Sequence, residues 1–158
     1  DAVYLRISRE NSIEVFDDNY NFVEGKFYEI IPDYQDCVVI TSGPLIKHCY
    51  AAVKDLRKKY KIGLINLPTI KPLNDKQLID IVKKTKRIFT VEDHSILGGL
   101  GSAINERIIA NSLNKKICIY NHGIKDTFTQ SDDVENLYKF FKLDKNSIKN
   151  ILTKFLAK

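Results

Sequence analysis

Apolar extended runs alternate with helical patterns along most of this chain, and this alternation restricts its fold more than any other feature. The extended runs carry apolar residues at consecutive positions, which makes both faces of each strand apolar: 36–41, 62–67, 87–93 and 116–121. The segments between and after them carry apolar residues at helical spacing: 45–60, 74–85, 101–113, 132–143 and 144–156. Strands that are apolar on both faces are typical of a parallel sheet covered on both sides.

Right-handed crossovers between such strands predict an α/β fold that is doubly wound and three-layered, with a mostly parallel sheet and helices on both faces. Asn74 and Asp144 are predicted helix N-caps, and Ser131 or Asp132 is predicted to cap the helix at 132–143. Residues 1–35 break the alternation. They read as a strand, "AVYLRISREN", followed by a hairpin or irregular arm. We therefore predict the end of a preceding domain plus a linker at 1–35, and the doubly wound domain at 36–158.

Composition narrows the class of protein. The chain has 158 residues, of which 44% are hydrophobic and 28% charged, as in a globular domain. No apolar run approaches the roughly 20 residues of a membrane-spanning helix, and "DAVYLRIS" lacks a signal-peptide pattern. The net charge of +5 comes from lysines spread over helical segments without interleaved aromatic residues. We predict no nucleic-acid partner and no membrane partner.

The cysteines and the absence of methionine give two further expectations. Cys37, Cys49 and Cys118 are odd in number and show no CxxC spacing. Cys37 and Cys118 fall in runs that read as buried strands, so we expect free core thiols and a reducing, cytoplasmic setting. Because the chain contains no methionine, we expect it to be part of a larger protein.

A glycine cluster after the third strand resembles the start of a nucleotide-binding loop. The stretch "FTVEDHSILGGLGSAINERI", residues 89–108, runs from a strand through Gly98, Gly99 and Gly101 into a helix. The spacing lacks the third glycine of the dinucleotide fingerprint, and no lysine supports a phosphate-binding P-loop. We predict that these glycines allow a tight turn and close packing of the helix start. Glu92 or Asp93 is predicted to lie near that helix start without a ligand.

Three side chains near strand ends are candidates for polar or catalytic support. Glu92 and His94 are two residues apart, so an extended strand would place them on one face. His122 is predicted in a loop at the carboxyl edge of the sheet, where sites in such folds lie. Since no other ligands occur at motif spacing, we predict no metal site in this chain.

Three stretches together carry a resemblance to a known family. They are "INLPTIKPLND", "TVEDHSILGGLGSAINERI" and "HGIKDTFTQSDDVENLYKFFKLD". In this order and spacing they resemble the C-terminal domain of transketolases, especially the C-terminal subunits of split transketolases. The related domains of 1-deoxyxylulose-5-phosphate synthases and of 2-oxo acid dehydrogenase beta subunits are similar. The resemblance implies a sheet of about five strands with one antiparallel strand.

The resemblance also implies a function for the parent enzyme. Transketolases use thiamine diphosphate and Mg²⁺ to move a two-carbon ketol unit between sugar phosphates, as in the pentose phosphate pathway. Their C-terminal domain supports the dimer and the edge of the active site. The resemblance implies that this chain binds neither cofactor and is inactive alone. Its implied partners are a second copy or an N-terminal transketolase subunit. The alternatives are a 1-deoxyxylulose-5-phosphate synthase, or a dehydrogenase beta-type assembly domain without activity of its own.

Arg9 is the residue to which the resemblance assigns a direct role. "YLRISREN" resembles the last strand of the family's middle domain, in which an SRxN segment supplies an arginine to the substrate's phosphate. A guanidinium suits that task, because it stays charged and offers phosphate oxygens a planar fork of donors. We therefore predict that Arg9 binds the substrate phosphate.

Overall fold

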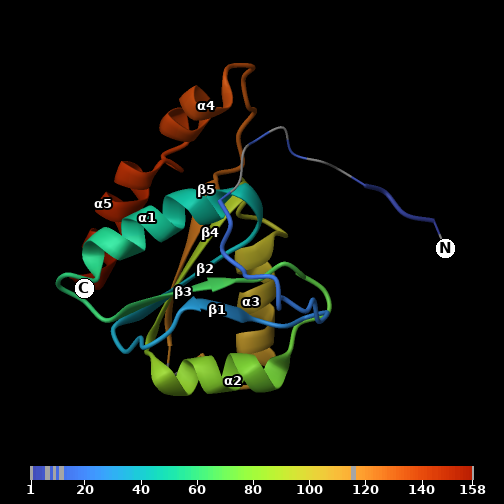
Figure 1. Cartoon of the computed structure of the whole chain (residues 1–158), viewed down its shortest axis with the longest axis vertical. Helices are drawn as coiled ribbons and strands as arrows, with labels where there is room; N and C mark the ends of the chain where they lie inside the picture. The colour runs from blue at the N-terminus through green and yellow to red at the C-terminus, as the bar shows by residue number, and fades with distance from the viewer. Residues whose placement is uncertain (1, 6–7, 9, 11–12, 115–116, 158) are drawn as a thin grey trace.

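The computed structural model describes residues 2–5, 8, 10, 13–114 and 117–157 of the chain. Within these ranges the chain forms one sheet with helices on both faces (Figure 1). The strands are β1 (Tyr28–Ile31), β2 (Cys37–Thr41), β3 (Ile62–Asn66), β4 (Arg87–Ser95) and β5 (Cys118–Ile124). The α-helices are α1 (Ile46–Leu56), α2 (Asp75–Lys84), α3 (Leu100–Ala110), α4 (Val134–Phe140) and α5 (Lys145–Leu156), and a 3₁₀ turn, Gly43–Leu45, precedes α1.

The sheet has the strand order β1-β3-β2-β4-β5. β2 pairs in parallel with β3 and β4, β4 pairs in parallel with β5, and β1 alone pairs antiparallel, with β3. This arrangement confirms the predicted doubly wound, mostly parallel sheet with one antiparallel strand. All five residues of the central strand β2 are buried, as its apolar run predicts.

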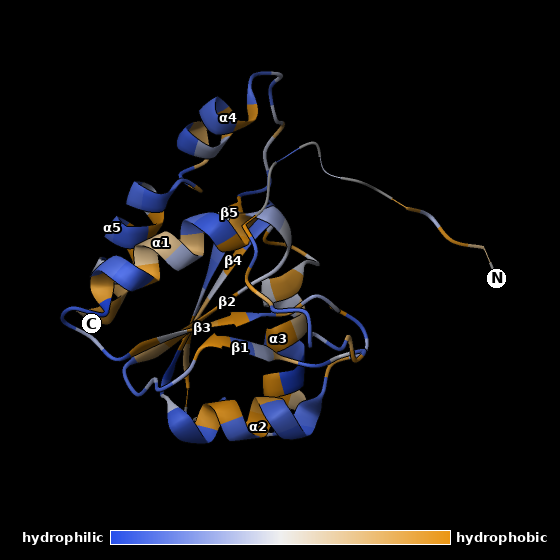
Figure 2. Ribbon diagram, viewed as in Figure 1, coloured by the Kyte–Doolittle hydropathy of each residue, from blue (hydrophilic) through white to orange (hydrophobic). Residues whose placement is uncertain are grey.

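Alternating side chains of the strands divide the core into two layers. Cys37 and Val39 belong to the cluster that packs against α1 and α5, whereas Val38 and Ile40 belong to the cluster under α2 and α3. Figure 2 shows the central strands as hydrophobic, while the helices carry hydrophilic stretches on their outer sides. Both faces of the sheet are thus covered, which leaves its edges and the strand ends for function.

The N-terminal region differs from its predicted form. Of the described residues before Tyr28, none lies in a strand, although "AVYLRISREN" reads as one. A strand needs a neighbour for its backbone hydrogen bonds, and the described residues of that stretch pair with no other described segment. β1 lies within 1–35, yet it belongs to the main sheet through its pairing with β3. The division of the chain at residue 35 into two domains stays a prediction.

Two helix caps are confirmed and one is wrong. Asn74 accepts a hydrogen bond from the Gln77 amide at 3.1 Å, and Asp144 accepts bonds from the amides of Asn146 and Ser147. The residue before α4 is Asp133, which makes no side-chain cap bond. Asp132 Oδ1 instead accepts from the Asp133 amide at 2.7 Å and from the Asn136 side chain at 3.0 Å, and neither donor is a backbone amide within α4.

The cysteine prediction is also corrected in part. Cys37 and Cys49 are buried free thiols, but Cys118 is exposed. Cys118 is the first residue of β5, and β5 is the last strand of the sheet, so no further strand covers it.

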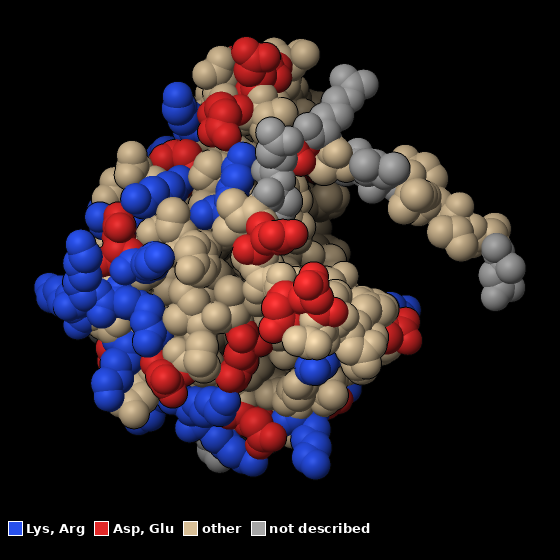
Figure 3. All heavy atoms as spheres, in the orientation of Figure 1, with Lys and Arg blue, Asp and Glu red and all other residues tan. Residues whose placement is uncertain are grey.

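Charge on the outside of the molecule is mixed in sign. On the face drawn in Figure 3, lysine and arginine side chains gather around the ends of α1 and α5 and along α2, and acidic side chains gather between them. Among the described helices, none has the length and apolar character needed to span a bilayer.

Candidate functional site

The carboxyl ends of β2, β3 and β4 form the crevice where sites in doubly wound sheets are found. The chain runs from β2 to β3 on one side and then to β4 on the other, so the direction of winding changes at β2. Two cavities, of about 560 Å³ and 300 Å³, open over these ends and share Ser42 and Gly43. The winding and the cavities together make this edge the candidate site.

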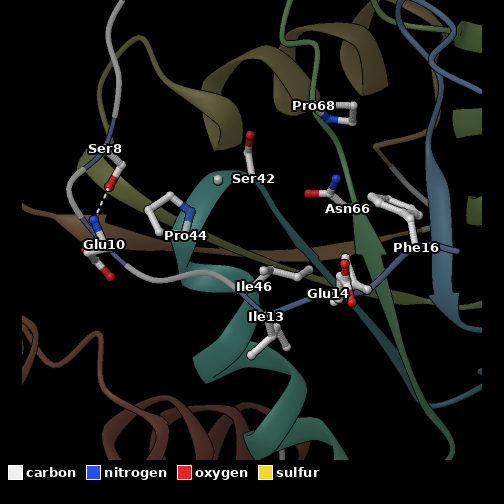
Figure 4. Close-up of a pocket in the computed structure, with 12 residues that line it drawn as sticks. Ser8, Glu10, Ile13, Glu14, Phe16, Ser42, Pro44, Ile46, Asn66 and Pro68 are labelled. Carbon is white, nitrogen blue, oxygen red and sulfur yellow. Dashed lines mark hydrogen bonds between the residues drawn. The ribbon is translucent and has the colours of Figure 1, made fainter. Parts of the chain in front are cut away.

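The larger cavity lies between the N-terminal segment and the loops after β2 and β3 (Figure 4). Ser8, Glu10 and Glu14 line it from the N-terminal side, opposite Ser42 and Asn66. The Ser8 hydroxyl accepts a hydrogen bond from the Glu10 amide at 3.1 Å. Arg9, the predicted phosphate ligand, lies outside the described residues. Ser8 and Glu10, the residues on either side of Arg9 in the sequence, both line this cavity.

Glu92 occupies the anion position at the start of α3. Its side chain is buried, with Oε2 accepting from the Leu100 amide at 2.8 Å and Oε1 from the Gly101 amide at 3.0 Å. The first amides of a helix, with the positive end of its dipole, attract a negative group. Here a carboxylate of the same chain takes these donors, which confirms the prediction that an acidic residue lies near the start of this helix. The loop therefore does not fit a phosphate or diphosphate.

The glycines of this loop are required by packing. A Cβ on Gly99 would overlap the Glu92 carboxylate, and one on Gly101 would lie 2.5 Å from the Cγ of Asn121. Asn121 and Thr90 hydrogen-bond to each other directly beneath, at 3.0 Å. This confirms that the glycines let the helix begin close to the sheet.

His94 lies in the smaller cavity with Glu92 but on its exposed side. The pairing of β4 with β5 shifts register between Val91 and Ser95, so the strand is irregular where these side chains project. His94 is exposed, and its Nδ1 lies 3.4 Å from the Ser95 carbonyl oxygen. The structure therefore brings His94 and Glu92 to one cavity, although both Glu92 oxygens already bond to the α3 backbone. Polar or catalytic support by His94 stays a prediction.

His122 lies apart from this pair and inside β5, so its predicted placement in a loop is wrong. The strand extends to Ile124 because Gly123 lets it pass close to the backbone of His94. The buried His122 lines a separate cavity of about 680 Å³ with Tyr120, Lys142 and Phe155. Its Nε2 lies 2.8 Å from the Lys142 carbonyl oxygen, and burial lowers its pKa. The neutral imidazole is therefore a donor to the α4–α5 connection in the folded chain.

One polar cluster was missed by sequence reasoning. The Tyr138 hydroxyl of α4 donates to Glu10 Oε1, and Lys47 Nζ of α1 lies 3.2 Å from Glu10 Oε2. Lys47 also pairs with Glu135 at 3.1 Å. No local spacing joins residues this far apart in the chain, so the cluster becomes visible only in the fold. Among the described residues, no three His, Cys, Asp or Glu side chains converge as metal ligands.

Replacing Glu92 tests its role at the start of α3. Glu92→Gln keeps one carbonyl oxygen but turns the second acceptor into a donor that faces a backbone amide. We expect the free energy of unfolding to fall by about 1–3 kcal/mol in chemical denaturation. Glu106→Gln, on the exposed side of the same helix, should change it by less than about 0.5 kcal/mol. Equal effects of the two variants would contradict this role.

The lowered pKa of His122 predicts a pH dependence of stability. In the unfolded chain the imidazole titrates near its usual pKa of about 6.5, whereas burial disfavours its protonation in the folded state. The unfolded state therefore binds more protons as the pH falls through this range, and stability falls with it. We expect the free energy of unfolding to decrease less between pH 7.5 and 5.5 in His122→Gln than in the wild type. His48, whose pKa is also lowered by burial and by Lys47, is present in both proteins. Parallel pH profiles would contradict the assignment.

Comparison with known proteins places the chain in a family. A family model described as "Transketolase, C-terminal domain" matches residues 28–148. A protein of Methanocaldococcus jannaschii that carries the name of a transketolase C-terminal section is 35% identical over 150 residues. That match covers 92% of this chain and 45% of that protein. A 1-deoxy-D-xylulose-5-phosphate synthase of Francisella philomiragia is 37% identical over 102 residues, covering 65% of this chain and 16% of that enzyme.

A solved structure is similar over nearly the whole chain. It is described as a split gene transketolase in the form of an inactive beta4 tetramer. It has a TM-score of 0.81 at 23% identity and covers 94% of this chain and 48% of that one. At this identity the likeness establishes the fold. The chain thus spans less than half the length of each of these proteins. With the match over residues 28–148, the chain belongs to the transketolase C-terminal domain family.

Proposed function

We propose that the chain is the C-terminal portion of a thiamine diphosphate-dependent transketolase that transfers a two-carbon ketol unit between sugar phosphates. The similarity to the Methanocaldococcus jannaschii protein carries this proposal, because it covers 92% of the chain. Residues 28–158 are 131 of the 158 residues, or 83% of the chain. A match that covers 92% of the chain therefore also includes residues before Tyr28.

In this proposal the other domains supply the cofactors. Thiamine diphosphate, when bound there with Mg²⁺, would carry the ketol unit. The residues of this chain do not fit a diphosphate at the α3 loop, since Glu92 takes the amides of Leu100 and Gly101. The role of this chain is to bind the substrate phosphate through Arg9 and to close the active-site edge with the N-terminal segment over β2 and β3. Its free cysteines agree with a cytoplasmic enzyme.

Assembly is the second part of the proposal. Val3, Tyr4 and Leu5 are 86%, 90% and 76% exposed, so three consecutive large apolar side chains are left largely uncovered by the part of the chain that the structure describes. Such a stretch fits a partner that offers a sheet edge or an apolar face. We propose an N-terminal transketolase subunit or domain, within a dimer of the complete enzyme. Size-exclusion chromatography of the chain with and without that partner tests this, and a chain that stays monomeric in both cases contradicts it.

A synthase is the alternative function, favoured by the 37% identity to the Francisella philomiragia enzyme. The segment "ISREN" favours transketolase. The synthases to which the chain is similar tend to have a Tyr-Pro-Arg-Gly run at this place. Product analysis of the complete enzyme separates the two functions. Formation of 1-deoxy-D-xylulose 5-phosphate would overturn the transketolase assignment.

Cofactor binding by this chain alone provides one test. We expect thiamine diphosphate with Mg²⁺ to leave the thermal unfolding midpoint of the chain unchanged, because a ligand raises stability only if it binds the folded state. Addition of the N-terminal partner chain should restore both the cofactor-dependent shift and ketol transfer. A saturable rise of the midpoint in the chain alone would contradict the proposed division of roles.

Arg9 provides the second test. In the complete enzyme, Arg9→Ala should raise KM for phosphorylated ketose donors on the order of tenfold or more, since a charge-assisted fork to phosphate is lost. The KM of Arg9→Lys should lie between those of the wild type and Arg9→Ala, because lysine keeps the charge but not the planar fork. Lys58→Ala, which removes an exposed charge elsewhere, should leave KM unchanged. An unchanged KM in Arg9→Ala would contradict the role of this residue.

A further inference from the structure

Glu10 connects the N-terminal segment to two helices that are distant in sequence. Its Oε1 accepts the hydroxyl proton of Tyr138 in α4, and its Oε2 lies 3.2 Å from Lys47 Nζ in α1. Oε1 thus has a hydrogen-bond donor and Oε2 an ion-pair partner, and the two partners come from different helices. We call Glu10, Lys47, Tyr138 and Glu135 the Glu10 cluster.

The cluster is shielded from solvent more than an ordinary surface ion pair. The side chains of Glu10 and Lys47 are 12% and 22% exposed, and Tyr138 is buried. Ion pairs at exposed positions contribute little because water screens them, whereas shielding strengthens the attraction and makes an unpaired charge costly. Removing a partner of Glu10 would therefore favour release of the segment, so that the carboxylate could reach water.

Two further contacts support the side chains of the cluster. Lys47 also pairs with Glu135 at 3.1 Å, and the His48 ring packs edge-on against Tyr138 at 5.0 Å between centroids. Burial, followed by the Glu10 carboxylate, raises the pKa of Tyr138. Burial opposes the charge on Lys47, but its bonds to Glu135 and Glu10 outweigh this and raise its pKa. Tyr138 therefore remains a donor, and Lys47 a cation, at every working pH.

The two residues on either side of Arg9 in the sequence are hydrogen-bonded to each other. The Glu10 amide donates to the Ser8 hydroxyl at 3.1 Å, which joins the two residues on either side of it (Figure 4). Adjacent Cα atoms are about 3.8 Å apart, so a displacement of Glu10 is passed directly to its neighbour. The same two residues line the 560 Å³ cavity at the carboxyl edge of the sheet.

We propose that Glu10 is a positioning residue for substrate-phosphate binding: helices α1 and α4 hold Glu10 through its carboxylate, and Glu10 is the residue next to Arg9 in the chain. The position at which Arg9 meets the phosphate is then set by this domain. The inference rests on the proposed function. It assigns Tyr138 and Lys47 an indirect effect on substrate binding, because both contact Glu10.

The test removes a single hydroxyl group, that of Tyr138, from the complete enzyme. Tyr138→Phe keeps the ring and its packing but removes the donor to Glu10. We expect KM for a phosphorylated donor to rise on the order of tenfold, the cost of one hydrogen bond to a charged group. The kinetic constants for a ketol donor without a phosphate group should stay unchanged. Glu10→Gln should act in the same direction. Tyr50→Phe, which removes a hydroxyl of α1 outside the cluster, is the matched control and should have no effect.

The combination with Arg9→Ala separates the possible results. Because Glu10 acts through Arg9, Tyr138→Phe should add no further rise of KM to the Arg9→Ala enzyme. If Arg9→Ala raises KM and Tyr138→Phe does not, the inference is overturned and the proposed function stands. If Arg9→Ala itself has no effect, the role of Arg9 and the inference both fall. Equal losses with both kinds of donor would show a general structural defect and would also overturn the inference.

Discussion

The contact between the Glu92 carboxylate and the first amides of α3 is the interaction on which the carboxyl edge of the sheet depends. It fastens the end of β4 to the helix that follows, with both oxygens bonded to the backbone at 2.8 Å and 3.0 Å. A carboxylate there is favoured by the helix dipole and satisfies donors that would otherwise need water or a ligand. The Glu92 carboxylate also requires a glycine at position 99, since a side chain on Gly99 would overlap it. In this loop, which resembles a phosphate-binding loop in sequence, the first amides of α3 thus bind the Glu92 carboxylate.

Much of the fold was predictable because the apolar pattern is redundant along the chain. Each central strand is apolar on both faces, and only a covered parallel sheet buries such strands completely. The caps at Asn74 and Asp144 follow from short-range chemistry, in which a side chain bonds to an amide two or three residues later. The glycine loop was predictable for the same reason, since Glu92 and Gly101 are close in sequence.

Contacts between distant segments were not predictable from local pattern. The end of β5 was misplaced because His122 and Gly123 look like loop residues, whereas the close backbone of β4 extends the strand through them. The burial of His122 depends on the α4–α5 connection, whose carbonyl at Lys142 accepts its bond. Likewise, Glu10 and Tyr138 meet across most of the chain. Side chains of this kind show no periodicity or spacing that would reveal a partner.

Residues 3–5 and Glu10, which lie close together in the sequence, have opposite chemistry. Val3, Tyr4 and Leu5 expose apolar surface that the described residues do not cover, whereas Glu10 is held by an ion pair to α1 and a hydrogen bond from α4. Exposed apolar side chains beside a residue that is bound to the domain are suited to join the domain to a partner. Under the proposed function, residues 3–5 add to the neighbouring domain and Glu10 sets their register. On that proposal, Glu10 and its contacts with α1 and α4 are the route by which this domain influences the binding of substrate phosphate by Arg9.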